Sequence, residues 1–495
     1  MQRLICLLAL VLPAPAAVAA PAAPSAPRTN YNVLLIISDD LKAELGCYGS
    51  PIAKTPCLDK LASSGVRFDR GYCQYPLCCP ARTSMLTGRK PTTSGVVGNR
   101  TWFGELHPDY ITLPRYFKDH GYVSARTGKI FHDGIDDTDA WDEGGEARYL
   151  AGAPKNATAR QVRRPSTNAT EQARENVPSR ASHSDRVVIV ENSGENEHDY
   201  RVATKAVELL RQYKDRPFFI ACGFSTPHSP LTAPRRFFDL YDPAKIPLPP
   251  DFAARPTVPP GFPKQAIRPR NADLFINRDA TPDEARQVIR GYLAAVSWVD
   301  FNVGRVLDGL DSLGLRDNTI VVFWGDQGYQ LGEKGKWSKA GSLFEAVDRV
   351  PFIIRAPGLA GNGKPCGRVV ESLDFYPTLV ELCGLPPAPG VEGRSLVPLL
   401  KKPSTPWDHP AYTVWSEDGV NLRGVAVRTE KWRYAEFEDG GAMLLDPEND
   451  PKELKNRADD PKLAGVRAEL SKLVQAYRAG YVPPREAPKS SQVGD

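Results

Sequence analysis

The sequence has little cysteine, little methionine and almost no net charge. Its 495 residues include nine Cys and three Met, and 63 Lys and Arg against 59 Asp and Glu leave a formal charge of +4. Nine Cys are too few for a disulfide scaffold of this length. So small a positive excess argues against a protein that binds nucleic acid through a basic surface. The apolar share of 41% and charged share of 25% are those of a globular protein, which excludes wholesale disorder.

Long apolar runs are also missing beyond the N-terminus. No later run of about 18 apolar residues occurs, so no stable membrane span is predicted. Residues 1–20 are predicted to be a signal peptide, because Arg3 precedes the apolar stretch Leu4–Leu12 and Ala17-Val18-Ala19 resembles a cleavage site. An N-terminal anchor is the alternative. Residues 21–30 should form a Pro/Ala tether. Export would place the protein in the periplasm or outside the cell, or in a lysosome-type compartment if the source is eukaryotic.

Apolar strands alternate with amphipathic helices along most of the chain. The run Val33–Ile37 is apolar on both faces, as in a strand buried within a parallel sheet. A helix opened by the capping box Thr281–Glu284 should reach about Leu313, either unbroken or with one break. The pattern predicts an α/β protein with a mostly parallel sheet flanked by helices. The expected strands are Tyr31–Ser38, Val66–Tyr72, Val123–Thr127, Pro217–Gly223, Thr319–Trp324 and Val350–Arg355, and the other expected helices are Leu58–Ser64, Leu113–His120 and Tyr200–Tyr213.

The character of the sequence changes near Trp407. Residues 31–405 are predicted to form a catalytic domain that contains a polar insertion at 142–197 and a Pro-rich coil at 246–270. Residues 406–482 should form a small α+β subdomain with an antiparallel sheet, and residues 483–495 a flexible tail. The expected elements of the subdomain are the strands Tyr412–Ser416, Gly424–Arg428 and Trp432–Glu436 and the helix Leu463–Tyr477.

Acidic residues follow two of the predicted strands. Asp39-Asp40 stands where the first strand stops, and Asp326-Gln327 follows the strand Thr319–Trp324. Neighbouring side chains on a strand point to opposite faces, so two adjacent carboxylates converge on one cation only where the backbone turns. Strand carboxyl ends are where α/β sheets bind ligands. These oxygens suit a hard cation such as Ca²⁺. The alternatives are an Asp-Asp turn or helix cap and an Asx-type turn.

The most specific pattern is the segment Leu77–Arg89, which reads LCCPARTSMLTGR. A helix entered near Pro80 and closed by Gly88 would place Cys78 at its N-terminus, where the dipole and free N–H groups favour an anion. Arg82, one turn further on, could contact the same anion. As a nucleophile Cys78 would ordinarily need a His partner. A disulfide with Cys79 or Cys73 is the alternative.

Cys78-x-Pro80-x-Arg82, followed by Leu86-Thr87-Gly88-Arg89, resembles the signature of the type I sulfatases. That family has an alkaline-phosphatase-like core and converts the Cys to Cα-formylglycine. Further matches follow in family order between about residues 31 and 460. They are Asp39-Asp40, Leu45–Gly49, Gly128–His132, Pro227–Pro230, Asp326–Gly328, Leu331–Lys339 and Asp446–Glu453. Leu45–Gly49 and the Lys-x-x-His spacing are most similar to iduronate-2-sulfatase-like members.

The resemblance implies a secreted enzyme that hydrolyses a sulfate monoester, on a sulfated sugar or glycosaminoglycan. Its implied partners are that sulfated carbohydrate and a formylglycine-generating, or equivalent sulfatase-maturating, enzyme. The hydrated aldehyde at position 78 would attack sulfur, and Ca²⁺ would be held by residue 78 with Asp39, Asp40, Asp326 and Gln327. The remaining implied catalytic residues are Arg82, Lys129 and Lys339 around the sulfate, His228, alone or with Lys339, as proton donor to the leaving oxygen, and His132 as the base that releases sulfate.

Two positions depart from the family pattern. Ala81 stands where Ser is commoner, and Gln327 stands where the family carries Asn or His. Gln keeps a neutral oxygen donor but adds a methylene.

Four further side chains have two interpretations each. His132 and His228 are either catalytic residues or a surface and a turn residue, and Trp102 and Trp337 are either sugar platforms or core residues. Cys366 and Cys383 either pair or remain free.

Two other functions fit parts of the sequence. One is a formylglycine-dependent phosphodiesterase or phosphonate monoester hydrolase. The other is a non-catalytic, secreted glycan-binding protein in which Cys78 is never converted.

Overall fold

The computed structural model describes residues 31–148 and 186–483. The predicted signal peptide, the tether, most of the polar insertion and the C-terminal tail lie outside these ranges. Within them, no helix is both long enough and apolar enough to cross a membrane.

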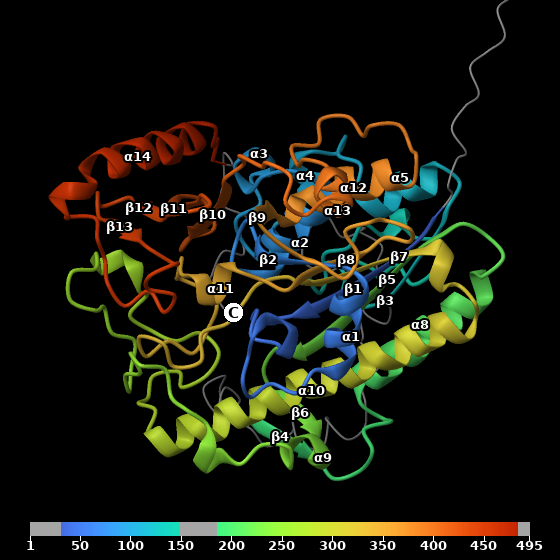
Figure 1. Cartoon of the computed structure of the whole chain (residues 1–495), viewed down its shortest axis with the longest axis horizontal. Helices are drawn as coiled ribbons and strands as arrows, with labels where there is room; N and C mark the ends of the chain where they lie inside the picture. The colour runs from blue at the N-terminus through green and yellow to red at the C-terminus, as the bar shows by residue number, and fades with distance from the viewer. Residues whose placement is uncertain (1–30, 149–185, 484–495) are drawn as a thin grey trace, which may run out of the picture.

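A seven-stranded sheet forms the centre of the molecule, in the order β3-β5-β1-β7-β8-β2-β9 (Figure 1). β3, β5, β1 and β7 are mutually parallel neighbours. The fold is therefore α/β with a mostly parallel sheet, as predicted. The strands are β1 (Asn32–Asp39), β2 (Val66–Tyr72), β3 (Val123–Gly128), β5 (Phe218–Pro227), β7 (Thr319–Gly325), β8 (Phe352–Arg355) and β9 (Pro365–Glu371).

β8 departs from the expected parallel arrangement. It runs antiparallel to both β7 and β2, with Phe352 opposite Trp324. The reason lies in the connection: residues 326–351 include only a four-residue helix, α11 (Glu345–Asp348), so no helix carries the chain back across the sheet. The segment stays at the carboxyl end of β7 and is free to build a site there. β9, an edge strand with Pro and Gly in it, was not predicted.

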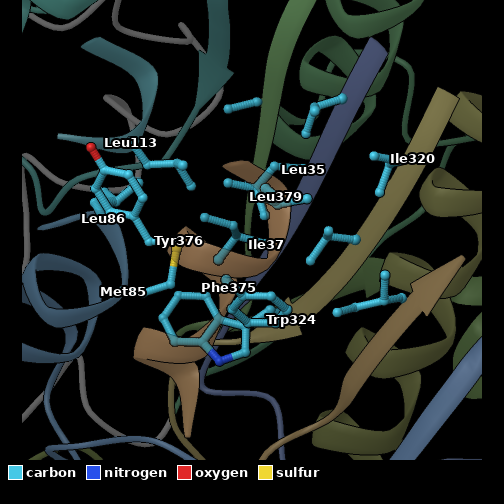
Figure 2. Close-up of a cluster of buried hydrophobic side chains, with 14 of the residues drawn as sticks. Leu35, Ile37, Met85, Leu86, Leu113, Ile320, Trp324, Phe375, Tyr376 and Leu379 are labelled. Carbon is cyan, nitrogen blue, oxygen red and sulfur yellow. The ribbon is translucent and has the colours of Figure 1, made fainter. Parts of the chain in front are cut away.

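Both faces of the sheet are covered, and β1 shows how. Val33, Leu35 and Ile37 belong to one buried cluster, whereas Leu34 and Ile36 belong to another. The first cluster packs under α2, α5, α12 and α13, and Figure 2 shows Leu35 and Ile37 among Met85, Leu86 and Leu379. The second packs under α1, α8 and α10 (Figure 1). Continuous apolar strands thus reflect burial on two sides.

Of the covering helices, α1, α2, α5, α8 and α10 match the sequence pattern, whereas α12 and α13 were not predicted. α10 is one continuous helix of 31 residues with the expected Thr281–Glu284 capping box, so it has no break. The helices are α1 (Pro56–Ser64), α2 (Cys78–Thr87), α3 (Pro91–Ser94), α4 (Phe103–Leu106), α5 (Leu113–Asp119), α8 (His198–Tyr213), α9 (Arg235–Phe238), α10 (Pro282–Ser312), α12 (Phe375–Leu382), α13 (Val397–Lys401) and α14 (Ala464–Ala479).

A four-stranded antiparallel sheet follows at the C-terminus, covered by α14. The predicted strands and helix are present, and a fourth strand, β13, was missed. Its strands are β10 (Ala411–Ser416), β11 (Leu422–Arg428), β12 (Arg433–Phe437) and β13 (Ala442–Leu445). A third, two-stranded sheet pairs β4 (Val187–Val190), at the end of the polar insertion, with β6 (Leu231–Pro234).

Three side-chain alternatives left open by the sequence are settled by the fold. All eight cysteines of the described chain are free thiols, so Cys366 and Cys383 do not pair and Cys78 has no disulfide. Trp337 is fully buried and packs on Phe275, so it is a core residue rather than a sugar platform.

Candidate active site

The candidate site lies at the carboxyl edge of the four parallel strands. Lys129 follows β3, His228 follows β5, Asp39 ends β1, and Asp326 follows β7. These strands are hydrogen-bonded neighbours, so their ends bring together residues far apart in sequence. The alternation of strands and helices thus explains why the scattered polar residues converge.

Cys78 is the first residue of α2 and is almost fully buried. The helix begins two residues before Pro80, where the sequence suggested its start, and ends at Gly88, which has a φ of 65°. The Cys78 Sγ lies 3.3 Å from Asp39 Oδ1 and 3.3 Å from Gln327 Nε2. The residue expected to supply the nucleophile therefore touches the residues expected to hold the cation.

Three buried carboxylates and one amide, the side chains expected to hold a cation, lie together. Ligand oxygens of Asp39, Asp40 and Asp326 lie within 4.8 Å of one another. Gln327 Nε2 donates to Asp40 Oδ1 at 2.6 Å and lies 3.4 Å from Asp39 Oδ1, while its Oε1 is buried without a hydrogen-bond partner. A cluster of hard oxygens with one unsatisfied oxygen beside it suits Ca²⁺. The donor set of this chain therefore fits the ion.

Three cationic side chains surround the carboxylates. Arg82 donates through Nε to Asp326 Oδ2 at 2.7 Å and through Nη1 to the carbonyl of Lys129, whereas its buried Nη2 has no hydrogen-bond partner. Lys129 pairs with Asp39, and Lys339 lies 2.9 Å from Asp40 Oδ1. Such preorganised charges can stabilise a bound anion such as sulfate.

The two predicted histidines occupy different environments. His228 is about one-third exposed, its Nδ1 bonds the Ser229 carbonyl at 2.8 Å, and its Nε2 lies 3.9 Å from Asp40 Oδ2. His132 Nδ1 is buried without a hydrogen-bond partner. Burial and the charge of Lys129 hold the pKa of His132 well below its usual value, so it is a neutral group able to accept a proton.

Electrostatics separate the acidic residues of the site. Burial alone would raise the pKa of Asp39, but Lys129, His228 and Arg82 outweigh it and hold that pKa well below the usual range. Burial raises the pKa of Asp326 to about 7, against the opposing charge of Arg82. Burial, assisted by Asp39, also raises the pKa of the Cys78 thiol. A reactive cysteine has a lowered pKa, so this thiol is poorly suited to act as a nucleophile without modification.

Two further buried side chains, which the sequence pattern did not indicate, support the site. Asp199, on α8, accepts hydrogen bonds from the backbone N–H groups of Ser225 and Thr226, both at 3.0 Å, and so fixes the end of β5 before His228. Tyr292, on α10, contacts the backbone at Asp40. Both lie on amphipathic helices, where one polar residue among apolar ones carries no signal of its role.

Comparison with known proteins identifies the family. The sulfatase family model matches residues 31–385. The chain belongs to the sulfatase family. A second model, for the C-terminal part of N-sulphoglucosamine sulphohydrolase, matches residues 332–480. As a family member with this match, the protein is a sulfuric ester hydrolase.

Relatives extend over most of the chain. A sulfatase of Formosa agariphila is 34% identical over 475 residues, which cover 91% of this chain and 87% of that protein. Iduronate 2-sulfatase of Homo sapiens is 30% identical over 478 residues, covering 81% of this chain and 84% of the human sulfatase. The family resemblance seen in the sequence is confirmed.

Solved structures share the fold. The phosphonate monoester hydrolase of Agrobacterium radiobacter superposes with a TM-score of 0.72 at 22% identity, covering 92% of this chain and 96% of that one. A protein crystallised with its substrate D-glucosamine-2-N,6-O-disulfate gives a TM-score of 0.71 at 22% identity, covering 91% of this chain and 98% of that one. The alkaline-phosphatase-like fold expected for the sulfatase core is thus present.

Proposed function

We propose that this sulfatase is exported and removes sulfate from a sulfated sugar, with a nucleophile formed by conversion of Cys78 to formylglycine. The observation that carries the proposal is the position of Cys78 Sγ, 3.3 Å from Asp39 Oδ1 and beside a cluster of carboxylates and cations. The high pKa of the thiol supports conversion, because an unmodified Cys78 would be a weak nucleophile at neutral pH.

The proposed cation is Ca²⁺, held by Asp39, Asp40, Asp326, Gln327 and residue 78. When bound, it would lower the pKa of a hydroxyl on residue 78 and draw in a sulfate oxygen. Rotation of the Gln327 amide about its last bond exchanges Nε2 and Oε1, which would present the unsatisfied oxygen to the ion.

The surrounding side chains divide the remaining work. Arg82, Lys129 and Lys339 would neutralise the sulfate oxygens. His228, the more exposed histidine, would give a proton to the departing sugar oxygen as its bond to sulfur breaks. His132, kept neutral by burial, would accept the proton of the second hydroxyl on residue 78. Loss of that proton releases sulfate and regenerates the aldehyde. One water is consumed overall, and the products are the free hydroxyl and inorganic sulfate.

A sulfated carbohydrate is the proposed substrate because several relatives are named as sulfatases of sugars. One is iduronate 2-sulfatase, and another is an N-acetylglucosamine-6-O-sulfatase of Bacteroides thetaiotaomicron that is 25% identical and covers 91% of this chain. Export is proposed from residues 1–20 of the sequence.

The test combines peptide mass spectrometry across Cys78 with a screen of defined sulfated mono- and disaccharides and phosphate diesters. We expect formylglycine at position 78 and release of sulfate in preference to phosphate. Cys78→Ala should abolish turnover, whereas Cys73→Ala, which removes another buried thiol nearby in sequence, should retain it. A free thiol in active protein would overturn the proposed nucleophile, and preference for phosphate diesters would overturn the proposed substrate.

A further inference from the structure

Asp39 and Asp40 are adjacent in sequence, yet both carboxylates contact the same amide. Gln327 Nε2 lies 3.4 Å from Asp39 Oδ1 and 2.6 Å from Asp40 Oδ1. Continued strand geometry would point these neighbours to opposite faces of the sheet. The backbone turns instead: Asp40 has a φ of 60°, in the left-handed region that residues with a Cβ seldom occupy. Contacts from elsewhere must hold this unfavourable conformation.

The hydroxyl of Tyr292 makes two of those contacts. Tyr292 Oη donates to the Asp40 carbonyl at 2.7 Å and accepts from the Lys42 backbone N–H at 2.8 Å. A phenol has one proton, and because Lys42 N is itself a donor, that proton must go to Asp40. Tyr292 is 3% exposed, so water does not compete for either bond. One hydroxyl therefore spans both sides of the turn.

We propose that Tyr292 is a positioning residue for the cation site, whose hydroxyl holds the left-handed turn that brings the Asp40 carboxylate back beside that of Asp39. Tyr292 contacts the backbone at Asp40 and not the carboxylate, so it acts through the turn alone. This inference rests on the proposed function, because it takes Asp40 as a ligand of the ion.

The same turn is tied to the loop that carries Lys339. The Lys42 ammonium pairs with Glu333, and Glu333 Oε2 accepts from the Leu331 N–H at 2.5 Å. At the other end of that loop, Lys339 Nζ lies 2.9 Å from Asp40 Oδ1. Loosening the turn at Tyr292 would therefore first displace the Asp40 carboxylate, the proposed ligand. It would then displace Lys339, which pairs with that carboxylate.

The test is Tyr292→Phe, which removes the hydroxyl and leaves the ring. Tyr241→Phe is the matched control, because the Tyr241 hydroxyl is also buried, bonds Ser297 on α10 at 2.6 Å and accepts from the Lys54 backbone N–H at 3.0 Å, away from the site. Both variants and the wild type are purified with conversion of Cys78 verified, and Ca²⁺ is titrated into each by calorimetry.

We expect the dissociation constant for Ca²⁺ to rise about tenfold in Tyr292→Phe, the effect of losing a buried hydrogen-bonding group. In Tyr241→Phe it should stay at the wild-type value, although both variants melt at a similarly lowered temperature in chelator. At saturating Ca²⁺ the kcat of Tyr292→Phe should recover to the wild-type value. If the substitution had damaged the active site itself, kcat would stay low. The rise in melting temperature on adding Ca²⁺ provides a second measurement that needs little protein.

Two failures can be told apart. If the wild type binds one Ca²⁺ and hydrolyses sulfate esters but Tyr292→Phe binds the ion as tightly as Tyr241→Phe, the inference is wrong and the proposed function stands. If the wild type binds no Ca²⁺, the proposed cation site is wrong and the inference is wrong with it.

Discussion

Arg82 and Asp326 form a fully buried ion pair, with Arg82 Nε 2.7 Å from Asp326 Oδ2 across 244 residues of sequence. The pair joins the helix that begins at Cys78 to the end of β7. Burying both charges costs desolvation free energy that the rest of the fold must offset, and removing one partner would leave an uncompensated buried charge. The pair therefore fixes the position of the start of α2 relative to the end of β7.

Arg82→Lys should therefore be far from conservative. Lys cannot reproduce the fork that bonds both Asp326 and the Lys129 carbonyl, and it places its charge at a single point. We expect kcat/KM for a sulfate ester to fall at least about 100-fold, as for loss of a preorganised donor to a developing charge. Steady-state kinetics measure this, with Arg115→Lys as the control, because Arg115 lies in an exposed pair with Asp119. A loss of less than threefold in Arg82→Lys would contradict this role.

Much of the layout of the candidate site was predictable because its residues stand at strand ends. Asp39, Lys129, His228 and Asp326 each follow an apolar strand, and parallel strands deliver their carboxyl ends to one edge. The place of Cys78 was predictable for a different reason, since Gly88 marks the end of a helix that must begin near Pro80. Local patterns of this kind need no knowledge of distant contacts.

What could not be predicted depends on contacts between distant segments. The antiparallel direction of β8 follows from a connection that lacks a crossover helix, and its four residues read like any other apolar strand. Tyr292 and Asp199 sit on helices whose period places them toward the core, but only the folded chain shows which backbone groups they meet. The strands β9 and β13 were likewise not predicted, because β9 contains Pro, Gly and charged residues and β13 is only four residues long.

Gln327 is the second position that we expect to respond to substitution. Gln327→Leu keeps much of the volume but removes the amide, so the dissociation constant for Ca²⁺ should rise about tenfold through loss of one oxygen ligand. Gln327→Asn restores an oxygen on a shorter side chain and should bind the ion more tightly than the Leu variant. Calorimetric titration gives both values. Equal affinity in the Leu variant and the wild type would show that Gln327 is not a ligand.

His132 should act after the sugar has left. Because its pKa is held well below the usual value, it is neutral and can accept a proton, whereas Ala at this position cannot. His132→Ala should release one equivalent of alcohol and then stop with sulfate attached at residue 78, which intact-protein mass spectrometry detects. His120→Asn is the control, since His120 bonds the Tyr116 carbonyl away from the site. Sustained turnover by His132→Ala would rule out its assignment as the base.

Glu345 connects the catalytic core to the C-terminal sheet and makes stability depend on pH. Its carboxylate accepts from Tyr72 at 2.8 Å and from Arg428 at 3.0 Å. Burial alone would raise the pKa of Glu345, but Arg428, Arg433 and Arg349 outweigh it and bring the pKa to about 2. The folded state thus keeps this carboxylate charged at lower pH than the unfolded state does. Its contribution is complete above about pH 4.5, the ordinary value, and is lost as the pH falls towards 2.

Glu345→Gln should therefore unfold more easily at neutral pH, by about 3 kcal/mol, because it leaves the buried Arg428 without its acidic partner. It also removes one of the carboxylates beside Arg433, which keeps Asp348 and Glu453. Below pH 4.5 the wild type should lose stability faster than the variant, and the two should converge near pH 2. Denaturant unfolding at several pH values measures this. In Glu430→Gln, which breaks an exposed pair with Arg368, the change should stay below about 1 kcal/mol at every pH. If Glu345→Gln instead ran parallel to the wild type from pH 7 to pH 2, the lowered pKa would be wrong, and the arginines would be held by packing rather than by this carboxylate.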